Sequence, residues 1–570
     1  MAEEVWMLQT KKADFKQIGA RFRIDPVTAR IIRNRGIEGE AAIDRYLNGT
    51  LDDLYDPMLL KDMECAVSIL CEAVDTGKKI RIVGDYDIDG VCSTYILLQA
   101  FERLGSDVDF EIPDRIKDGY GINESIIEQA HADGVEVILT CDNGISAFHQ
   151  VELAKKYGMT VVITDHHEVP LDGEKEKIPP ADAVIDPKQA DCPYPFPEIC
   201  GAVVAYKLVQ VLYARRGVPQ MEWLDLLEFA AIATVGDVMK LQDENRILVK
   251  YGLKKMAQTK NLGLRRLAEK NNLDLGAITA YHIGFVIGPC LNAGGRLKTA
   301  KEALALLRAQ SEEEAERLAE ELKELNDTRK DMTEQGTEAA KLQVESWYQK
   351  DKVLVVFLPE CHESLAGIIA GRLREYYQKP AIVLTRGEEA VKGSGRSIDE
   401  YHMFKKLTEV SDLLLKFGGH PLAAGLSLEE KNIDEFRRRL NENAGLTEED
   451  FKAKVWIDVP MPVGYVTERL VRELSCLEPF GQGNEKPLFA EKSLRIRASR
   501  VLGRNRNVVK MTLEETDGHA IEALYFGDGT AFEEERAGRR EIDVVYYPDI
   551  NEYNGRKTLQ AVIRRYKFRG

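Results

Sequence analysis

Three short apolar runs in the first half of the chain each end in acidic or imidazole side chains. The run at 80–83 is followed by Asp85, Asp87 and Asp89. The run at 135–140 is followed by Asp142, and the run at 160–164 by Asp165, His166 and His167. Helical patterns separate the runs, and this alternation predicts an α/β fold with a parallel sheet. Because ligands bind at the carboxyl ends of parallel strands, we expect these side chains to gather in one pocket.

We call these three chain positions acidic tips. A fourth acidic tip, Asp237, follows an apolar stretch whose pattern favours a helix. Carboxylate oxygens with one or two imidazoles suit Mn²⁺ or Mg²⁺, and so many buried anions require cations. Two such ions about 3.5–4 Å apart can hold both the attacking and the leaving oxygen of a phosphoryl transfer. The alternative for any single aspartate is a helix N-cap or a turn residue, so only the four acidic tips together indicate a metal centre.

Asp87 and Asp89 alternate on a segment that we expect to be extended. We expect a turn here to point both carboxylates inward. Gly90 follows directly and would provide the backbone freedom for that turn.

The composition limits the class of protein. A length of 570 residues exceeds a single hydrophobic core and predicts about three or four domains. No apolar run reaches the ~20 residues of a membrane helix, and the amino terminus lacks the pattern of a signal peptide. Nine cysteines without a Cys-x-x-Cys pair argue against a disulfide framework and against structural zinc. We therefore expect a cytoplasmic protein without a membrane partner.

The net charge of −17 is unusual for a protein that binds a polyanion, but the basic residues are clustered. One cluster comprises Arg495, Arg497, Arg500, Arg504, Arg506 and Lys510, and the other Arg556, Lys557, Arg564, Arg565, Lys567 and Arg569. Local charge decides whether a polyanion binds, so these clusters favour a nucleic-acid surface. The alternative is that they only solvate the outer faces of strands.

The patterns divide the chain into five parts. We expect a helical lead-in at 1–75, an α/β catalytic domain at 76–310 and a connecting helix at 311–350. A smaller α/β domain at 351–447 and a small β-barrel of the OB type at 448–570 follow. A place in the core of the first domain is the alternative for the helix at 311–350.

Several motifs resemble one enzyme family. Residues 85–90, Asp-Tyr-Asp-Ile-Asp-Gly, and Asp165-His166-His167 resemble the DHH phosphoesterase superfamily. Residues 417–420, Phe-Gly-Gly-His, are similar to the GGH motif of its second domain, the DHHA1 type. Segments 288–296, 392–397 and 477–484 narrow the resemblance to the bacterial exonucleases of this superfamily that act on single-stranded DNA. The similarity covers nearly the whole chain in the same order.

The resemblance implies roles for the acidic tips. The metal ligands would be Asp87, Asp89, Asp142, His166 and Asp237, with Asp142 bridging two ions. His167 would lie against the scissile phosphate as an acid or a charge stabiliser, and Asp165 would orient a histidine. Several relatives carry a histidine where this chain has Val83. Either Asp85 replaces that ligand, or one metal is held more loosely with water.

The resemblance also implies a set of phosphate-binding residues: Arg115, Arg296, Ser394, Arg396 and His420. Arginine forks, hydroxyls and backbone amides hold a terminal phosphate well. Gly393 and Gly395 flank Ser394 and would let the backbone approach the phosphate closely. For each single arginine a surface salt bridge is the alternative, and His420 could simply cap a turn.

The function implied by the resemblance is a nuclease with two divalent cations, Mn²⁺ or Mg²⁺. It would release mononucleotides from the 5′ end of single-stranded DNA in recombination and repair, with a single-strand-binding protein and a RecQ-type helicase as partners. Two alternatives remain open. A phosphodiesterase for short oligonucleotides or cyclic dinucleotides would share both α/β domains, but generally lacks a domain such as 448–570. A non-catalytic DNA-binding scaffold would have lost carboxylates that this chain retains.

Overall fold

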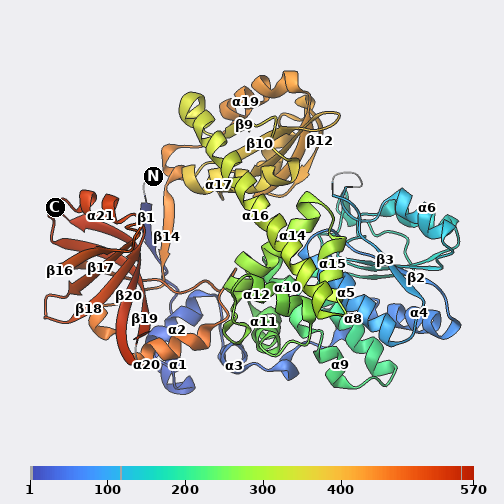
Figure 1. Cartoon of the computed structure of the whole chain (residues 1–570), viewed down its shortest axis with the longest axis horizontal. Helices are drawn as coiled ribbons and strands as arrows, with labels where there is room; N and C mark the ends of the chain where they lie inside the picture. Colours follow the sequence, from blue (N-terminus) through green and yellow to red (C-terminus); the bar gives the residue numbers. More distant parts are fainter. Residues whose placement is uncertain (1–3, 116–118, 554, 570) are drawn as a thin grey trace. The chain divides into compact units, whose positions relative to one another are not determined.

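The computed structural model describes residues 4–115, 119–553 and 555–569 (Figure 1). The chain forms two compact units. The first unit comprises Met1–Val5, Tyr55–Met239 and Tyr251–Ala453, and the second comprises Trp6–Leu54, Lys240–Lys250 and Lys454–Gly570. The chain therefore passes from one unit to the other several times, and the units do not follow the linear order of the sequence.

The first unit contains the parallel sheet that the apolar runs predict. Its order is β3-β2-β4-β5-β8, and every neighbouring pair is parallel. The strands are β2 (Ile80–Val83), β3 (Val108–Glu111), β4 (Val137–Cys141), β5 (Thr160–Thr164) and β8 (Ala183–Ile185). The prediction of a parallel sheet is confirmed, and the two edge strands, β3 and β8, extend the three predicted runs.

Helices cover both faces of this sheet, because its strands are buried on both sides. Helices α6 (Glu124–Ala132) and α7 (Phe148–Lys156) share one apolar core with Ile138 of β4 and with Val161 and Ile163 of β5. Helices α4 (Met63–Thr76), α5 (Ile88–Arg103) and α8 (Gly201–Arg215) also contact the strands. Figure 1 shows α5 and α8 beside the sheet.

The apolar stretch before Asp237 is a helix, as its pattern indicates. Helix α10 (Leu227–Gly236) is buried over its first eight residues and packs against both α5 and α8. A helix that is apolar on every side is stable only when it is surrounded by protein. Its last turn delivers Asp237 to the end of the sheet where the other acidic residues lie.

A long helix leads to the second α/β lobe of the first unit. Helix α16 (Glu312–Gln343) packs against α12 (Leu262–Lys270) and α14 (Gly288–Leu297), and also against α17 (Ala366–Tyr377) of the second lobe. It therefore connects the lobes and also belongs to the core of the first. Among the described residues, no helix is long and apolar enough to cross a membrane.

The second lobe is built on a five-stranded sheet of order β12-β13-β11-β10-β9. Its strands are β9 (Leu354–Phe357), β10 (Ala381–Arg386), β11 (Val391–Arg396), β12 (Leu414–Gly419) and β13 (Ala423–Leu428). Strands β9 and β10 are parallel, and the remaining pairs are antiparallel. Ser394 and Arg396 therefore lie on a central strand, opposite Gly425 and Ala423.

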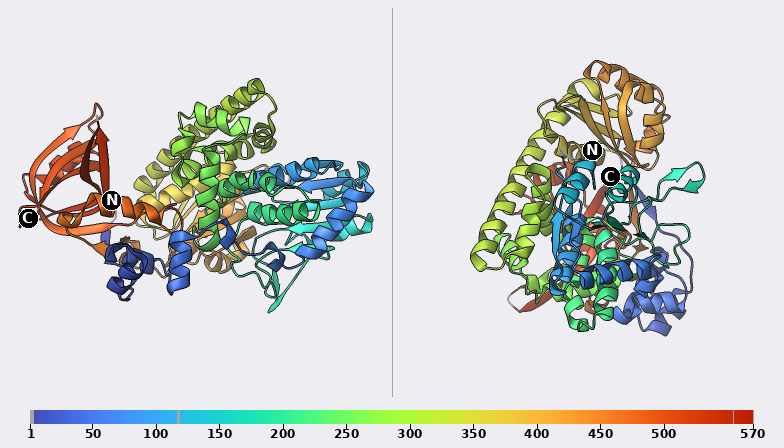
Figure 2. Two further views of the ribbon diagram at one scale, coloured as in Figure 1. Left: turned by 90° about the horizontal axis from the view of Figure 1, so that it is seen from below. Right: turned by 90° about the vertical axis from the view of Figure 1, so that its right-hand side faces the viewer.

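The second unit is dominated by a sheet whose strands close on themselves. Strand β16 (Phe489–Leu502) pairs with β17 (Val508–Glu514), and β19 (Glu541–Tyr553) pairs with both β20 (Arg556–Arg569) and β16. Strand β18 (Ala520–Phe526) completes the ring between β17 and β20, as the left view of Figure 2 shows. The closed sheet agrees with the OB-type barrel predicted for this region.

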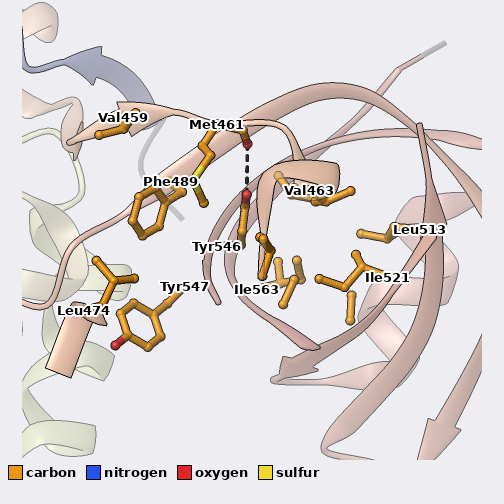
Figure 3. Close-up of a cluster of buried hydrophobic side chains, with 14 of the residues drawn as sticks. Val459, Met461, Val463, Leu474, Phe489, Leu513, Ile521, Tyr546, Tyr547 and Ile563 are labelled. Carbon is orange, nitrogen blue, oxygen red and sulfur yellow. Dashed lines mark hydrogen bonds between the residues drawn. The ribbon is translucent and has the colours of Figure 1, made fainter. Parts of the chain in front are cut away.

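The interior of the closed sheet is apolar. Phe489, Leu513, Ile521 and Ile563 point into it, and the buried hydroxyl of Tyr546 donates a hydrogen bond to the carbonyl of Met461 at 2.9 Å (Figure 3). Tyrosine can be buried here because that backbone carbonyl satisfies its hydroxyl.

The amino-terminal helices do not form a separate lead-in over 1–75. Helices α1 (Phe15–Phe22), α2 (Pro26–Asn34) and α3 (Glu40–Asn48) belong to the second unit, and Ile31 and Ile32 are part of its core. Helix α4 instead lies in the first unit. Three short helices bury too little apolar surface to be stable alone, which explains why they pack against a larger core.

Arg246 holds three segments of the second unit together. It lies on α11 (Asp243–Met256), its side chain is fully enclosed, and its guanidinium lies 4.0 Å from the ring centre of Tyr46. The guanidinium donates hydrogen bonds to the carbonyls of Tyr46 (3.1 Å), Leu477 (2.8 Å) and Cys476 (2.7 Å). Three backbone acceptors from two distant segments thus depend on one side chain.

We predict that Arg246→Met lowers the melting temperature of the second unit. Methionine fills similar space but leaves three carbonyls without a donor, at a cost of about 1–3 kcal/mol each. A loss of that size should lower the midpoint by about 5 °C or more in differential scanning calorimetry. The exposed Arg469→Met is the control and should leave the midpoint unchanged. An unshifted transition in Arg246→Met would contradict this role.

Candidate active site

Asp87 is the N-cap of helix α5. Its Oδ1 accepts hydrogen bonds from the backbone N–H groups of Asp89 (3.0 Å) and Gly90 (3.1 Å). The expectation of an extended segment was therefore wrong: the helix begins at Ile88, and Asp89 lies in its first turn. Gly90 is needed for a different reason, since a Cβ there would lie 2.3 Å from the carbonyl oxygen of Asp85.

Asp89 joins two helices. Its carboxylate accepts hydrogen bonds from the N–H groups of Gly201 (2.7 Å) and Ala202 (2.8 Å), the first two residues of α8. The amino ends of α5 and α8 therefore meet at this carboxylate, and each end carries partial positive charge. A Cβ at Gly201 would lie 2.7 Å from the Cβ of Asp142, so only glycine allows α8 to begin there.

Asp142 and His166 lie at the centre of the site. Asp142 follows β4 in a left-handed conformation with a φ of 61°. Nε2 of His166 lies 3.1 Å from Oδ1 of Asp142, 3.4 Å from Asp89 and 3.8 Å from Asp237. The four acidic tips predicted from the sequence thus meet around one imidazole.

His167 is held by Asp165 and Tyr120. Its Nδ1 lies 2.7 Å from Oδ1 of Asp165, whose other oxygen accepts the N–H of Ile145 at 2.9 Å. The hydroxyl of Tyr120 lies 3.1 Å from Nδ1 of His167 and donates to the carbonyl of Asp142 at 2.9 Å. Asp165 therefore contacts histidine rather than the centre of the acidic cluster, which agrees with an orienting role.

Burial and mutual repulsion disturb the protonation of the acidic cluster. Burial, with repulsion from the neighbouring carboxylates, raises the pKa of Asp85 and of Asp142 well above the ordinary range. The same causes raise the pKa of Asp237 to about 8. For His167, burial opposes the charged form, but the hydrogen bond to Asp165 prevails and raises the pKa to about 9. Perturbed groups of this kind are typical of functional sites.

The donor atoms fit divalent cations. Asp89, His166 and Asp237 form one group whose ligand atoms all lie within 4.8 Å of one another, and Asp85, Asp87 and Asp142 form a second. Oδ1 of Asp85, Oδ1 of Asp142 and Nδ1 of His166 are buried without a hydrogen-bond partner among the described residues. Buried anions of this kind are stable only with a cation or a proton, and hard oxygen ligands match Mn²⁺ and Mg²⁺.

Cavities extend from the acidic cluster toward the second lobe. A cavity of about 140 Å³ is lined by Asp87, Tyr86, Arg115 and Arg296, among others. The last three residues also line a cavity of about 650 Å³ that reaches Ser394 and Arg396. The structure therefore brings four of the five predicted phosphate-binding residues to one continuous lining.

Arginines are crowded in this lining. Burial, together with the neighbouring Arg115 and Arg329, lowers the pKa of Arg296 to about 10, and burial also lowers the pKa of Arg396. Arginines that are crowded together and shielded from water favour the binding of an anion. The anion accepts the hydrogen bonds that water would otherwise accept. We call the part of the lining formed by Arg115, Arg296, Ser394 and Arg396 the cradle. A Cβ at Gly367 would lie 2.8 Å from Oγ of Ser394, so glycine keeps the cradle open.

His420 lies elsewhere than in this lining. It is exposed on the turn between β12 and β13, and its N–H donates to the carbonyl of Ala423 at 2.8 Å. The residues that line the two cavities do not include it.

Three residues of the site were missed in the sequence. Asp186 follows β8 and is fully buried, and burial raises its pKa to about 7. The sequence could have indicated Asp186, because it follows a short apolar run as the other aspartates do. Tyr120 stands between two glycines and Gly201 follows Cys200, and neither position carried a pattern that indicated a contact with His167 or Asp142.

Fold and site together define a DHH-type phosphoesterase with a second lobe and a closed carboxyl-terminal sheet. Three family models match: the DHH family, N-terminal domain, at residues 79–234, the DHHA1 domain at 350–445, and the RecJ OB domain at 457–565. The chain belongs to the RecJ family.

Individual relatives are similar over nearly the whole chain. The single-stranded-DNA-specific exonuclease RecJ of Bacillus subtilis is 36% identical, over 98% of this chain and 70% of its own length. The Escherichia coli protein of that name is 34% identical over 95% of both chains. The crystal structure of RecJ from Thermus thermophilus in complex with Mn²⁺ matches with a TM-score of 0.84 and 28% identity, over 99% of this chain and 80% of that one. The same protein was also solved with Mg²⁺.

We predict that Asp142→Asn weakens Mn²⁺ binding. Asp142 belongs to the second group, and its buried Oδ1 lies 3.1 Å from Nε2 of His166 in the first, so its loss should affect both ions. Changes to outer-shell residues already cost about 10–100-fold in metal affinity, and loss of a direct ligand should cost at least that. Calorimetric titration should give two Mn²⁺ per wild-type chain. The exposed Asp412→Asn should titrate like the wild type, and equal titration of Asp142→Asn would contradict the assignment.

Proposed function

We propose that the chain is a metal-dependent exonuclease that hydrolyses single-stranded DNA from the 5′ end and releases 5′-mononucleotides in recombination and repair. The observation that supports this best is the continuous lining from Asp87 to Ser394 and Arg396. It connects an acidic cluster suited to hydrolysis with a cationic cradle suited to a terminal phosphate.

The acidic residues act as metal ligands in this proposal. Asp89, His166 and Asp237 would hold one ion, and Asp85, Asp87 and Asp142 the other, with Asp142 and His166 facing both groups. When bound there, two divalent cations would neutralise charge on the scissile phosphate and lower the pKa of a water molecule. The helix N-termini at Asp87 and Asp89 fix these two carboxylates before substrate arrives.

His167 has the chemistry for a charge stabiliser. Its raised pKa keeps the imidazole protonated near neutral pH, and Asp165 and Tyr120 fix its orientation. A protonated imidazole beside the cluster can donate to a phosphate oxygen, or to the oxygen that leaves when the P–O bond breaks.

The direction of digestion would follow from the cradle. Arg115 and Arg296 come from the first lobe, and Ser394 and Arg396 from the second. A terminal 5′-phosphate held there would place a following phosphodiester near Asp87, and a strand without a free end could not occupy the cradle. Direction is thus set by the anchor for the end of the strand rather than by the ligands.

An exposed aromatic pair supports a single-stranded substrate. Tyr281 and Phe285 stack at 4.8 Å between ring centres, and their exposed fractions are 63% and 67%. They flank Gly284, which lines a small cavity together with Gly236 and Arg296. Exposed rings bind unpaired bases by stacking, which paired bases inside a duplex do not offer.

The closed sheet of the second unit would add affinity for DNA. Arg495 and Arg500 on β16 and Arg564 on β20 are exposed. Other arginines of the two basic clusters form ion pairs, Arg497 with Glu514 and Arg569 with Asp543. The proposed DNA surface therefore comprises only part of the two clusters.

The two alternatives are less well supported. A phosphodiesterase for short oligonucleotides needs no closed sheet of this kind, and the match to the RecJ OB domain spans 457–565. A non-catalytic scaffold has no use for a buried set of metal-ligand atoms. A cytoplasmic location, and a single-strand-binding protein with a RecQ-type helicase as partners, belong to the proposal through the family alone.

The decisive experiment is digestion of end-labelled DNA. With Mn²⁺ or Mg²⁺ we expect 5′-labelled single strands to release labelled mononucleotide at once, while duplex and chelator-treated samples stay intact. Asp142→Ala should lose about 10²-fold or more of the rate, because both ions depend on it, while single-strand binding persists. Release that starts at the 3′ end would refute the proposed direction.

We predict that Arg396→Ala weakens the preference for 5′-phosphorylated over 5′-hydroxyl strands. A hydrogen bond to a charged group contributes roughly 1.5–3 kcal/mol, so the preference should fall about ten-fold or more. Arg386→Ala is the matched control, since Arg386 ends the neighbouring strand and pairs with Glu430 at the surface. Mn²⁺ affinity should be unchanged in both variants. An unaltered preference in Arg396→Ala would contradict the proposal that the cradle binds the 5′-phosphate.

We also predict that replacing Arg495, Arg500 and Arg564 by alanine flattens the salt dependence of binding to long single strands. Each phosphate contact contributes about 0.7 to the slope of log affinity against log salt. Three lost contacts should therefore lower the slope by about two. Arg569→Ala, which removes a paired arginine, is the control. An unchanged slope in the triple variant would show that these three arginines do not contact the phosphates of the DNA.

A further inference from the structure

The cavity that contains the cradle is larger and more positively charged than one terminal phosphate requires. Its volume is about 650 Å³, and cavities of about 300–1,000 Å³ enclose whole small ligands. A phosphate monoester carries only about −1.5 to −2 charges near pH 7. The basic side chains that line the cavity are those of Arg115, Arg296, Arg372, Lys392 and Arg396. The cavity therefore has room and positive charge beyond the group that the cradle is proposed to bind.

Carboxylates neutralise little of this charge. Lys392 pairs with Glu363 at 3.0 Å. Glu375, the other acidic residue of the lining, pairs at 2.8 Å with Arg374, a residue outside the lining. The four arginines of the lining form no ion pair with any described residue. Their charge is therefore available to an anion that enters the cavity.

Arg372 lines the cavity but does not belong to the cradle. It is exposed on α17 and forms no hydrogen bond or ion pair within the described part of the chain. Burial and the positive charge of Arg372 lower the pKa of Arg329, so these two arginines repel each other. An anion at Arg372 would relieve this repulsion and accept the hydrogen bonds that its guanidinium can donate.

Helix α17 places Arg372 one turn beyond the cradle. A Cβ at Gly367 would lie 2.8 Å from Oγ of Ser394, and a Cβ at Gly371 would lie 4.0 Å from Cγ of Arg396. One helical turn separates the two glycines, about 6 Å at 1.5 Å per residue. Arg372 follows Gly371 directly. A short chain of phosphate groups that starts at Ser394 and runs along α17 therefore reaches Arg372.

The space continues past Arg372, but its charge changes. Arg372 and Glu375 also line an open groove of about 530 Å³ between α16 and α17. Glu334 and Glu338 of α16 line this groove as well. Lys341 pairs with Glu338 at 2.8 Å, whereas Glu334 forms no ion pair with a described residue. The groove would repel a longer anionic chain, so the positive region suits a short polyphosphate rather than a continuing DNA backbone.

We propose that the cavity accepts a 5′-triphosphate, with the α-phosphate in the cradle and the γ-phosphate at Arg372. The inference rests on the proposed exonuclease activity and adds a class of substrate to it. These substrates are single strands that keep the triphosphate with which a polymerase begins a new chain.

The reaction on such a strand would give a distinct first product. The oxygen of water would bond to the phosphorus between the first and second nucleotides, and the bond from that phosphorus to O3′ of the first nucleotide would break. O3′ takes up a proton, so the first product is a nucleoside 5′-triphosphate. The remaining strand begins with a 5′-monophosphate, and every later product is a mononucleotide.

Digestion of three single-stranded DNA oligonucleotides by the full chain with Mn²⁺ tests the inference. They share one sequence and end in a 5′-hydroxyl, a 5′-monophosphate or a 5′-triphosphate. We expect the triphosphate strand to be digested at least as fast as the monophosphate strand, with a nucleoside triphosphate as its first product in anion-exchange chromatography. Digestion of the monophosphate strand but not the triphosphate strand, or release of pyrophosphate before any nucleotide, would overturn the inference and leave the proposed function intact. Digestion of none of the three would refute both.

A variant locates the outer phosphates. Arg372→Ala should lower kcat/KM for the triphosphate strand, relative to the monophosphate strand, about ten-fold or more, because charged hydrogen bonds are lost. Arg372→Lys keeps the charge and should restore part of this ratio. Arg438→Ala is the matched control, since Arg438 is exposed on α19 (Ile433–Glu442) of the same lobe and pairs with Glu435 and Glu442. An unchanged ratio in Arg372→Ala would place the triphosphate elsewhere and refute the inference.

Discussion

Repulsion among buried carboxylates is the constraint on which the rest of the first unit depends. Asp85, Asp87, Asp89, Asp142 and Asp237 lie close together, and their shared burial would oppose folding if nothing offset it. Backbone amides offset part of it, since Asp87 caps α5 and Asp89 accepts two N–H groups from α8. The repulsion that the amides do not offset requires cations. The arrangement of carboxylates that opposes folding therefore also creates affinity for metal ions.

The helices around the sheet follow from that constraint. Helix α8 has to begin beside Asp142, which only Gly201 permits, and helix α10 has to end at Asp237. Helix α5 has to start at Ile88 and lie close to the Asp85 carbonyl, which only Gly90 permits. Two glycines without unusual backbone angles are thus as necessary to the site as its acids, because they set how closely the helices approach.

The sequence predicted the strand ends, because an apolar run followed by an acid is a local pattern. It also predicted that Asp237 follows a helix and that residues 448–570 form a small β-barrel. Contacts between distant segments left no local pattern. For this reason Tyr120 and Gly201 were missed, and α1 to α3 were placed in a helical lead-in over 1–75. Asp87 shows that two interpretations of one residue can both hold, since it caps a helix and lies in the acidic cluster.

The closed sheet of the second unit has a consequence for how it can bind a chain. Strand β19 pairs on both sides over its first half, with β16 and with β20, so this part of the described ring has no free edge. An extended peptide therefore cannot add itself there as a further strand through backbone hydrogen bonds. Recognition has to come from side chains on its outer surface and in its loops. Such recognition tolerates sliding of the bound strand, because no ladder of backbone pairs has to be broken at each step.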